Sequence, residues 1–259
     1  MKRILILTLI VAVIISAAAV MANNSFNYSE DEIAENSLHA FFGEKDQAVK
    51  YVGTGKNHYG EYYQFSTECG GNYYVDAGTY TVSRAEFPFE WSETNTVKIS
   101  LEDAEQNAYN FIKEKSSLSG IDKSDLIDSS LLNHGSYKEY KFVFRDVKDG
   151  VLLFNSAIVS VNPYSGDIIS YVSVDKNLEI SLAPEISEEK AIEIATNQFD
   201  NIRIVKKDAK IIVDYPDGTE QKLLWLVVIE GEPDNYILRG GSVIIDALSG
   251  EVYLKSSFK

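Results

Sequence analysis

GGSVIIDALSGEV, residues 240–252, consists of a double glycine, a β-rich run, an Asp-Ala pair and a turn. The stretch GGNYYVDA at residues 70–77 repeats the double glycine, the run and the Asp-Ala pair. Between them, NSAIVSVNPYSG at residues 155–166 has the same kind of run, which ends in Asn162 before the turn. A recurring unit decides an architecture before any local pattern does. The sequence therefore predicts three copies of one unit.

A helical pattern precedes each copy and opens with a serine, at Ser29, Ser100 and Ser187. Serine is a favoured N-cap, and the acidic residues that follow each one complement the positive end of a helix dipole. Small and aromatic residues then recur at helical spacing. They are Ala34, Leu38 and Phe42 (or Ile33, Ser37 and Phe41), then Leu101, Ala104, Ala108, Phe111 and Ile112, and lastly Ala191, Ile194, Ala195 and Phe199. Each helix is expected to lie on a sheet.

Strand-like runs follow each helix and are separated by turn residues such as Asp149-Gly150. The predicted strands are 49–52, 62–67, 73–76 and 81–85, then 140–147, 151–161 and 167–174, then 211–214, 221–230, 237–246 and 251–255. The predicted fold class is α+β, with tandem units at 29–86, 99–175 and 187–256, each one helix packed on a three- to four-stranded antiparallel sheet. The first unit is predicted to diverge, because Gly78-Thr79 comes one position early and no acidic residue follows.

The residues that close each copy have a structural explanation. Asp246 can accept a hydrogen bond from the backbone amide two residues later, and Gly250 can adopt the positive φ that returns the chain to a strand. Asn162 and Gly166 can do the same in the second copy. A catalytic role for Asp246 is disfavoured, since no second acid, base or nucleophile recurs beside it.

The third unit, from LWLVV at 224–228 to GSVIIDALSGEV at 241–252, resembles the PepSY domain. That family closes on a Val-Asp-Ala-x-Thr-Gly-Glu-Val motif, which this chain matches with Ser249 in place of threonine. The second unit, from 150–153 to 165–171, is similar to the related YcdB/YcdC-type repeats of exported proteins. The resemblance implies a small α+β module of the kind found in propeptides of secreted metallopeptidases, where it restrains or assists folding of a peptidase. No catalytic domain accompanies the units in this sequence, so a family role would be exerted on another chain.

The first 22 residues have the layout of a secretory signal. Lys2 and Arg3 precede an uncharged apolar stretch at residues 4–21, and Ala22 suits cleavage by signal peptidase. The stretch is also close to the length that spans a bilayer, so an uncleaved membrane tether through residues 4–21 is the alternative. The small residues at Ala17–Ala19 favour cleavage, and both readings predict a secreted or extracytoplasmic protein.

The formal net charge of −15, or −17 without the two cations of the leader, repels phosphate backbones. Nucleic acid is therefore excluded as a partner. Cys69 is the single cysteine, which leaves no intramolecular disulfide. We expect Cys69 to be buried, because it lies in a glycine-flanked aromatic segment.

Motifs for chemistry are missing from the sequence. There is no His-Glu-x-x-His, no Gly-x-Ser-x-Gly and no phosphate loop, and Gly53-Thr54-Gly55-Lys56 lacks the required spacing. The three histidines, His39, His58 and His134, lie one to a region, and Asp122, Asp125 and Asp128 read as a solvated acidic stripe. We predict no catalytic, cofactor-binding or metal-binding residues and no cofactor.

Seven aromatic residues gather in the first unit: Tyr59, Tyr62, Tyr63, Phe65, Tyr73, Tyr74 and Tyr80. In strands, Tyr62 and Tyr73 are expected to alternate with Tyr63 and Tyr74, so that one set faces the core and the other is exposed. Packing over a half-buried sheet is the simpler explanation, and a peptide- or glycan-binding surface is the alternative.

Three functions are consistent with these observations. The leading hypothesis is a non-enzymatic, exported binding module that engages or modulates another extracytoplasmic protein, of which a peptidase is the example that the resemblance suggests. The alternative is a structural spacer of the cell envelope. A hydrolase would require two carboxylates, or a histidine and a carboxylate, to converge in a pocket.

Overall fold

The computed structural model describes residues 28–43, 47–90, 96–116, 118, 120–200, 202–218, 220–234 and 237–258. The predicted leader at 1–22, with the stretch 4–21 that would tether it, lies outside these residues. No helix among the described residues has the length and apolar character needed to cross a membrane.

Each helix begins directly after one of the three serines. They are α2 (Glu30–Phe42), α3 (Leu101–Lys115) and α4 (Glu188–Thr196). The Ser100 hydroxyl accepts a hydrogen bond from the Asp103 amide at 3.1 Å. The Ser187 hydroxyl accepts one from the Lys190 amide at 3.3 Å. The faces that the helices bury carry the predicted small residues together with Leu38, Phe41 and Ile112.

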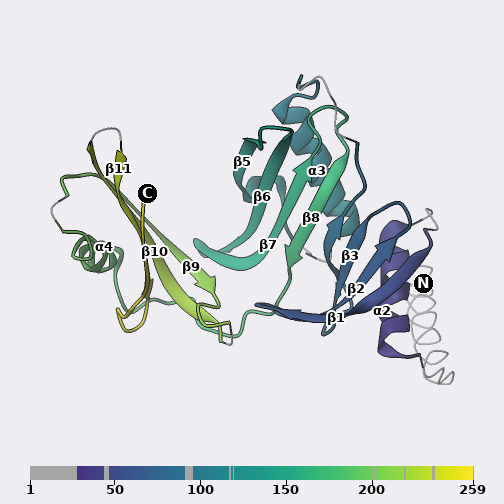
Figure 1. The fold of residues 1–259 in the computed structure, drawn as a ribbon. Helices are drawn as coiled ribbons and strands as arrows, with labels where there is room; N and C mark the ends of the chain where they lie inside the picture. Colours follow the sequence, from purple (N-terminus) through teal and green to yellow (C-terminus); the bar gives the residue numbers. More distant parts are fainter. Residues whose placement is uncertain are drawn as a thin grey trace, which may run out of the picture.

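Four strands follow each helix (Figure 1). The first unit has β1 (Val49–Asn57), β2 (Gly60–Thr67), β3 (Asn72–Asp76) and β4 (Val82–Glu86). The second has a 3-10 turn, η1 (Lys123–Asp125), and then β5 (Leu126–Asn133), β6 (Lys138–Lys148), β7 (Val151–Val161) and β8 (Ile168–Val174). The third has β9 (Ile204–Asp214), β10 (Lys222–Asp234), β11 (Ile237–Asp246) and β12 (Val252–Ser257). The α+β fold class is confirmed.

Two features of the strands differ from the sequence-based expectation. Strand β5 was not predicted, and Asp128 of the presumed acidic stripe lies within it. Strand β5 pairs only with β6 and has no buried residue along its length, which removes the usual sequence pattern of a half-buried strand. Strands β1 and β9 are also longer than predicted.

The last two strands of every unit share one register irregularity. In the first unit Tyr74 pairs with Arg84, whereas the next residue, Val75, pairs with Val82. The second unit repeats this at Ser160–Ser170 and Val161–Ile168, and the third at Ile244–Leu254 and Ile245–Val252. A β-bulge at one position in three sequences of low similarity indicates that it is part of the repeated fold.

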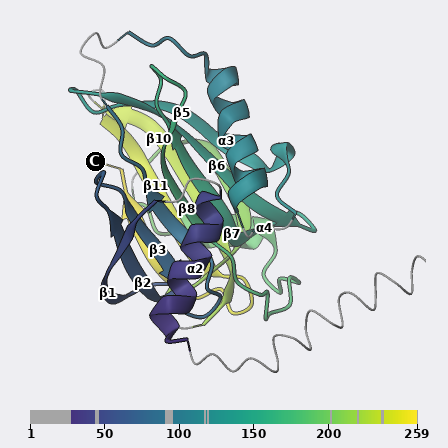
Figure 2. The same cartoon turned by 90° about the vertical axis from the view of Figure 1, so that its right-hand side faces the viewer.

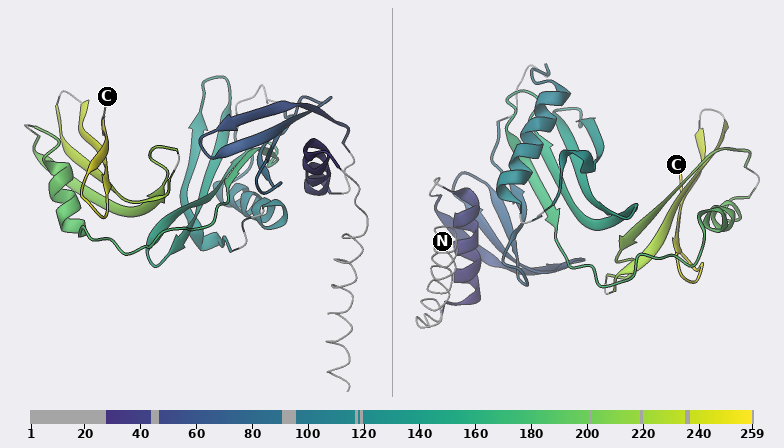
Figure 3. Two further views of the ribbon diagram at one scale, coloured as in Figure 1. Left: turned by 90° about the horizontal axis from the view of Figure 1, so that it is seen from below. Right: turned by 180° about the vertical axis from the view of Figure 1, so that it is seen from behind.

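One sheet runs through all twelve described strands. Strands β4 and β8 join the first two units antiparallel, and β7 meets β9 of the third unit at the pair Leu152–Ile212. Helices α2 and α3 cover the same face of the joined sheet (Figure 2). Helix α4 lies on the opposite outer side of the molecule, as the views from below and from behind also show (Figure 3).

Two hydrophobic cores result from this arrangement. The first lies under α2 and α3 and includes Phe65, Tyr73, Phe142 and Tyr171. The second lies under α4 and includes Trp225 and three residues at the beginning of β7, namely Val151, Leu153 and Phe154. Strand β7 contributes residues to both cores, so the second and third units pack against each other and are not separate domains joined by a linker.

A candidate binding cleft beside the first unit

Each unit closes in a turn that is built in the same way. The Asp246 carboxylate accepts hydrogen bonds from the amides of Leu248 and Ser249, both at 2.8 Å. The Asn162 side chain accepts one from the Tyr164 amide at 2.9 Å. Gly166 and Gly250 have φ of 82° and 79°. These turns have the predicted structural role.

The first unit has the same turn despite its divergent sequence. Asp76 accepts hydrogen bonds from the amides of Gly78 and Thr79, both at 2.9 Å. The backbone amide of Tyr80 donates to the Asp76 carbonyl at 2.8 Å, the bond that Gly166 and Gly250 make in the other units. Tyr80 therefore occupies the position of those glycines, and its φ is 55°. The divergence changes the residue in the turn and leaves the turn geometry intact.

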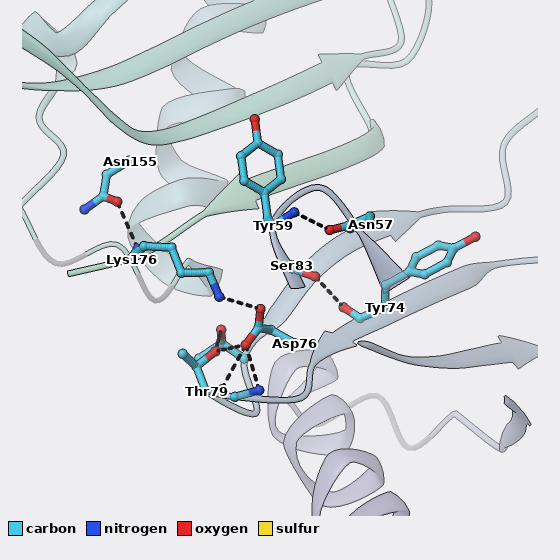
Figure 4. Close-up of polar contacts among 10 residues, drawn as sticks. Asn57, Tyr59, Tyr74, Asp76, Thr79, Ser83, Asn155 and Lys176 are labelled. Carbon is cyan, nitrogen blue, oxygen red and sulfur yellow. Dashed lines mark hydrogen bonds and ion pairs between the residues drawn. The ribbon is translucent and has the colours of Figure 1, made fainter. Parts of the chain in front are cut away.

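A cleft of about 250 Å³ lies between this turn, the β1–β2 hairpin and the end of β8. Its aromatic and cationic side chains come from the first unit, on the face of the sheet that α2 does not cover, and from the segment after β8. The lining includes Asn57, His58, Tyr59, Glu61, Tyr62, Tyr74, Asp76, Thr79, Ser83, Arg84, Asp175 and Lys176. Tyr59, Tyr74, Asp76 and Lys176 are shown in Figure 4.

The tyrosines divide between the core and the cleft differently from the sequence-based expectation. Tyr63 and Tyr73 are buried under α2, whereas Tyr62 and Tyr74 face the cleft. The expected sets, Tyr62 with Tyr73 and Tyr63 with Tyr74, were wrong because Gln64 pairs with Tyr74 across β2 and β3. Side chains directly opposite each other share a face, so this register puts Tyr74 on the side of Tyr62.

Aromatic and cationic groups form the floor of the cleft. The rings of Tyr62 and Tyr74 meet edge to face with centroids 5.3 Å apart. The Arg84 guanidinium carbon lies 5.2 Å from the Tyr74 ring centroid, within the range of a cation–π interaction. Burial raises the pKa of Tyr74, with a further contribution from Glu86 that Arg84 opposes. The phenol therefore stays protonated at neutral pH and can donate a hydrogen bond to a bound group.

An ion pair closes one end of the cleft (Figure 4). The Lys176 ammonium lies 2.9 Å from the Asp76 carboxylate, and the Lys176 amide donates to Asn155 at 2.9 Å. Burial by itself raises the pKa of Asp76. The hydrogen bonds from Lys176 and from the amides of Thr79 and Gly78 outweigh it, so the net pKa is lowered. The Asp76 carboxylate is thus already ion-paired and hydrogen-bonded, and it is a poor proton acceptor.

The tip of the β1–β2 hairpin brings the cleft close to the third unit. A Cβ atom built on Gly218, in the β9–β10 turn, would lie 3.0 Å from the His58 ring. Burial and the Asp214 carboxylate raise the pKa of Tyr59, and Arg145 opposes them. Arg145 in turn donates to the Val213 carbonyl at 3.2 Å. The cleft therefore lies where all three units come together.

One histidine and three carboxylate side chains line the cleft, namely His58, Glu61, Asp76 and Asp175. No hydrogen bond or ion pair of the described residues joins two of these side chains, and His58 contacts the Tyr59 ring edge to face. His134 lies elsewhere, 3.1 Å from Glu139, and His39 pairs with Glu35 on α2. Across the described ranges, no three His, Cys, Asp or Glu side chains gather as metal ligands would. The arrangement suits binding through stacking and hydrogen bonds.

Cys69 and the acidic stripe are the remaining sequence expectations on which the structure bears. Cys69 is exposed, so the prediction of burial was wrong; it lies in the β2–β3 turn, where its side chain does not reach the core. The Asp122 side chain caps η1 by accepting a hydrogen bond from the Lys123 amide, and the Asp125 side chain accepts one from the Asp122 amide. Arg84 and Lys176 were not predicted as site residues. Arg84 lies on strand β4 and Lys176 in the segment after β8, and neither lies in a sequence motif that marks a binding site.

No family model matches the sequence, and no curated protein matches it. Among solved structures, the Bacillus megaterium YpeB C-terminal domain resembles this chain with a TM-score of 0.51 and 16% sequence identity. The match covers 90% of this chain and 98% of that one. At this identity the similarity establishes the fold, which resembles that of the YpeB C-terminal domain.

Proposed function

We propose that this protein is an exported, non-catalytic module that binds another extracytoplasmic protein, and that the cleft beside the first unit receives a segment of that partner. The observation that carries the proposal is the floor formed by Tyr62, Tyr74 and Arg84 in a hollow of 250 Å³. Aromatic rings and arginine are the groups that contribute most to protein recognition.

The chemistry of the cleft favours binding over catalysis. A general base must be free to take a proton, and Asp76 is held by Lys176 and two backbone amides. Its lowered pKa further weakens it as a base. The phenols of Tyr59 and Tyr74 have raised pKa values, so they stay protonated at neutral pH and can donate hydrogen bonds to a bound segment.

A peptidase is the class of partner to test first. The support is the resemblance of the second and third units to modules found in peptidase propeptides, together with the apolar leader that predicts export. The fold is compatible with this proposal, since it resembles that of the Bacillus megaterium YpeB C-terminal domain.

The test combines the chain from Asn23 onward with the proteases that its producing organism secretes. We expect a stoichiometric complex on size exclusion and an altered rate of casein hydrolysis. The double substitution Tyr62→Ala, Tyr74→Ala should weaken both effects at least tenfold. Leu131→Ala removes an exposed apolar side chain on β5, far from the cleft, and should leave them unchanged. Absence of a complex, or equal weakening by both variants, contradicts the proposal.

A structural spacer of the cell envelope is the second candidate. It is favoured by the continuous sheet through all three units and by the contribution of β7 to both cores, which would hold the units rigidly. The spacer would be supported over the binding module if the protein stays in the wall or membrane fraction without a stoichiometric partner. That retention should not change when Tyr62 and Tyr74 are replaced by alanine.

A further inference from the structure

The junction between the first two units pairs equivalent strands of the repeat. Ala85 of β4 lies opposite Tyr171 of β8, and each is the ninth residue after the Asp or Asn of its closing turn. The flanking pairs are Arg84–Val172 and Glu86–Ser170, and the Phe87 amide donates to the Ile169 carbonyl at 2.9 Å. The pairing is therefore nearly twofold symmetric about the ninth position.

The third unit leaves the equivalent edge open. Strand β12 pairs with β11, and no strand among the described residues lies along its other side. The Phe258 amide donates to the Gly240 carbonyl at 2.9 Å, on the β11 side. Because backbone groups alternate in direction along a strand, those of Tyr253, Lys255 and Ser257 point outward. Leu254 on this strand is 54% exposed.

The surface beside β12 also lacks the aromatic packing that covers the β4–β8 junction. Between the first two units, Phe41 of α2 packs on Phe111 and Tyr171, with ring centroids 6.0 and 6.2 Å apart. Beside β12, a hollow of about 300 Å³ remains at the corresponding end of α4. Its lining includes two cations and one carboxylate, and the side chains that form it include Phe199, Asp200, Ile202, Arg239, Lys255 and Phe258.

The ninth residue after Asp246, which lies on β12, determines which strand can pair there. It is Lys255, whose ammonium contacts the Gln198 carbonyl and lies 4.8 Å from the Phe199 ring centroid. A second copy in the β4–β8 register would put Lys255 opposite Lys255, and like charges directly opposite are destabilising. Lysine on an edge strand is a known device against self-pairing. A carboxylate opposite Lys255 would be attracted by it and by the nearby Arg239.

We propose that β12 binds an extended segment of another protein by antiparallel strand addition, with an acidic residue opposite Lys255 and apolar residues beside the hollow at the end of α4. The register is that of the β4–β8 junction. This surface is separate from the aromatic cleft, and the inference stands without it.

Two peptides based on β8, the strand that pairs with β4 at the junction, test the proposal. Both comprise residues 166–176 of this chain, one with Tyr171→Glu and the other with Tyr171→Lys. They are titrated into the isotope-labelled chain from Asn23 onward, and amide shifts locate and quantify binding. We expect shifts along β12 and about tenfold tighter binding of the Glu peptide. The Lys255→Glu protein should reverse this preference.

A second pair of variants tests strand addition itself. Ser257→Pro removes an outward amide while leaving the amides that face β11, so it should abolish binding of both peptides. Ser257→Ala keeps the amide and should bind as the unaltered chain does. The proposal is overturned if the preference persists in Lys255→Glu, or if Ser257→Pro binds normally. It is also overturned if sedimentation shows a dimer that Ser257→Pro dissociates, because the edge would then serve a second copy.

Discussion

The closing turns show how far one residue can vary while a backbone conformation persists. Tyr80 has the left-handed φ that glycine supplies in the other two units, at a cost of roughly 1–2 kcal/mol for a residue with a side chain. Its ring stacks on Tyr63, with centroids 6.2 Å apart and an angle of 11° between the planes. Tyr80 also packs against the first core. We infer that this packing offsets the backbone strain.

Asp76→Asn isolates the charge of the ion pair at the cleft. Asparagine fits this turn, as Asn162 shows, so the variant should keep the turn and lose only the attraction to Lys176. We expect a loss of about 1 kcal/mol in the free energy of unfolding at pH 7, a value limited by solvent screening. Urea denaturation followed by circular dichroism measures it.

The pH dependence provides the check on this prediction. The folded state lowers the pKa of Asp76 below its ordinary value of 3.8, so its carboxylate stabilises the fold above pH 3.8. That stabilisation is lost as the pH falls through the lower folded-state pKa. The difference between the natural chain and Asp76→Asn should therefore shrink on acidification below pH 4. A difference that stays constant down to pH 3 would assign the effect to something other than the charge.

Among the elements, the helices depend on defined end groups and the strands on their neighbours. The helices were predicted from serine caps and periodic small residues, which act within one turn of chain. Strand β5 was missed because it is stabilised mainly by pairing with β6, a contact that its own sequence does not display. Local signals thus identify helices and turns better than edge strands.

Ser100→Ala tests the cap of α3. The substitution leaves the Asp103 amide without the acceptor that it has at 3.1 Å, and we expect a loss of about 1 kcal/mol in the free energy of unfolding. Ser100→Thr retains a hydroxyl and should lose less. Ser129→Ala on β5 exchanges an exposed serine in a strand and should change stability by less than about 0.5 kcal/mol. Equal losses in Ser100→Ala and Ser129→Ala would refute the role of the cap.

At the scale of the whole molecule, each core crosses a boundary between repeats. Phe41 of the first unit contacts Phe111 and Tyr171 of the second, and Phe154 of the second contacts Tyr215 of the third at 5.3 Å between ring centroids. Loss of one ring should therefore weaken the unit on the other side of the boundary as well. The three units are expected to unfold with strong coupling.

Phe41→Ala and Phe154→Ala distinguish the two boundaries. Each removes a buried ring, at an expected cost of about 3–5 kcal/mol. Phe41→Ala should speed hydrogen exchange in α3 and β8 as well as in α2, whereas Phe154→Ala should do so in β9 and β10. Exchange that accelerates only within the unit carrying the substitution would show that the units are energetically independent.

The sequence by itself determined the capped helices, the closing turns and the α+β class, because each depends on contacts between residues a few positions apart. The tertiary structure alone decided that β4 pairs with β8, that Tyr74 faces the cleft and Tyr73 the core, that Cys69 is exposed, and that Lys176 reaches Asp76. These features depend on strand register and on pairing between segments far apart in the chain, where a shift of one residue turns every side chain to the other face. For that reason the repeat could be read from the sequence, whereas the cleft and the open edge at β12 could not.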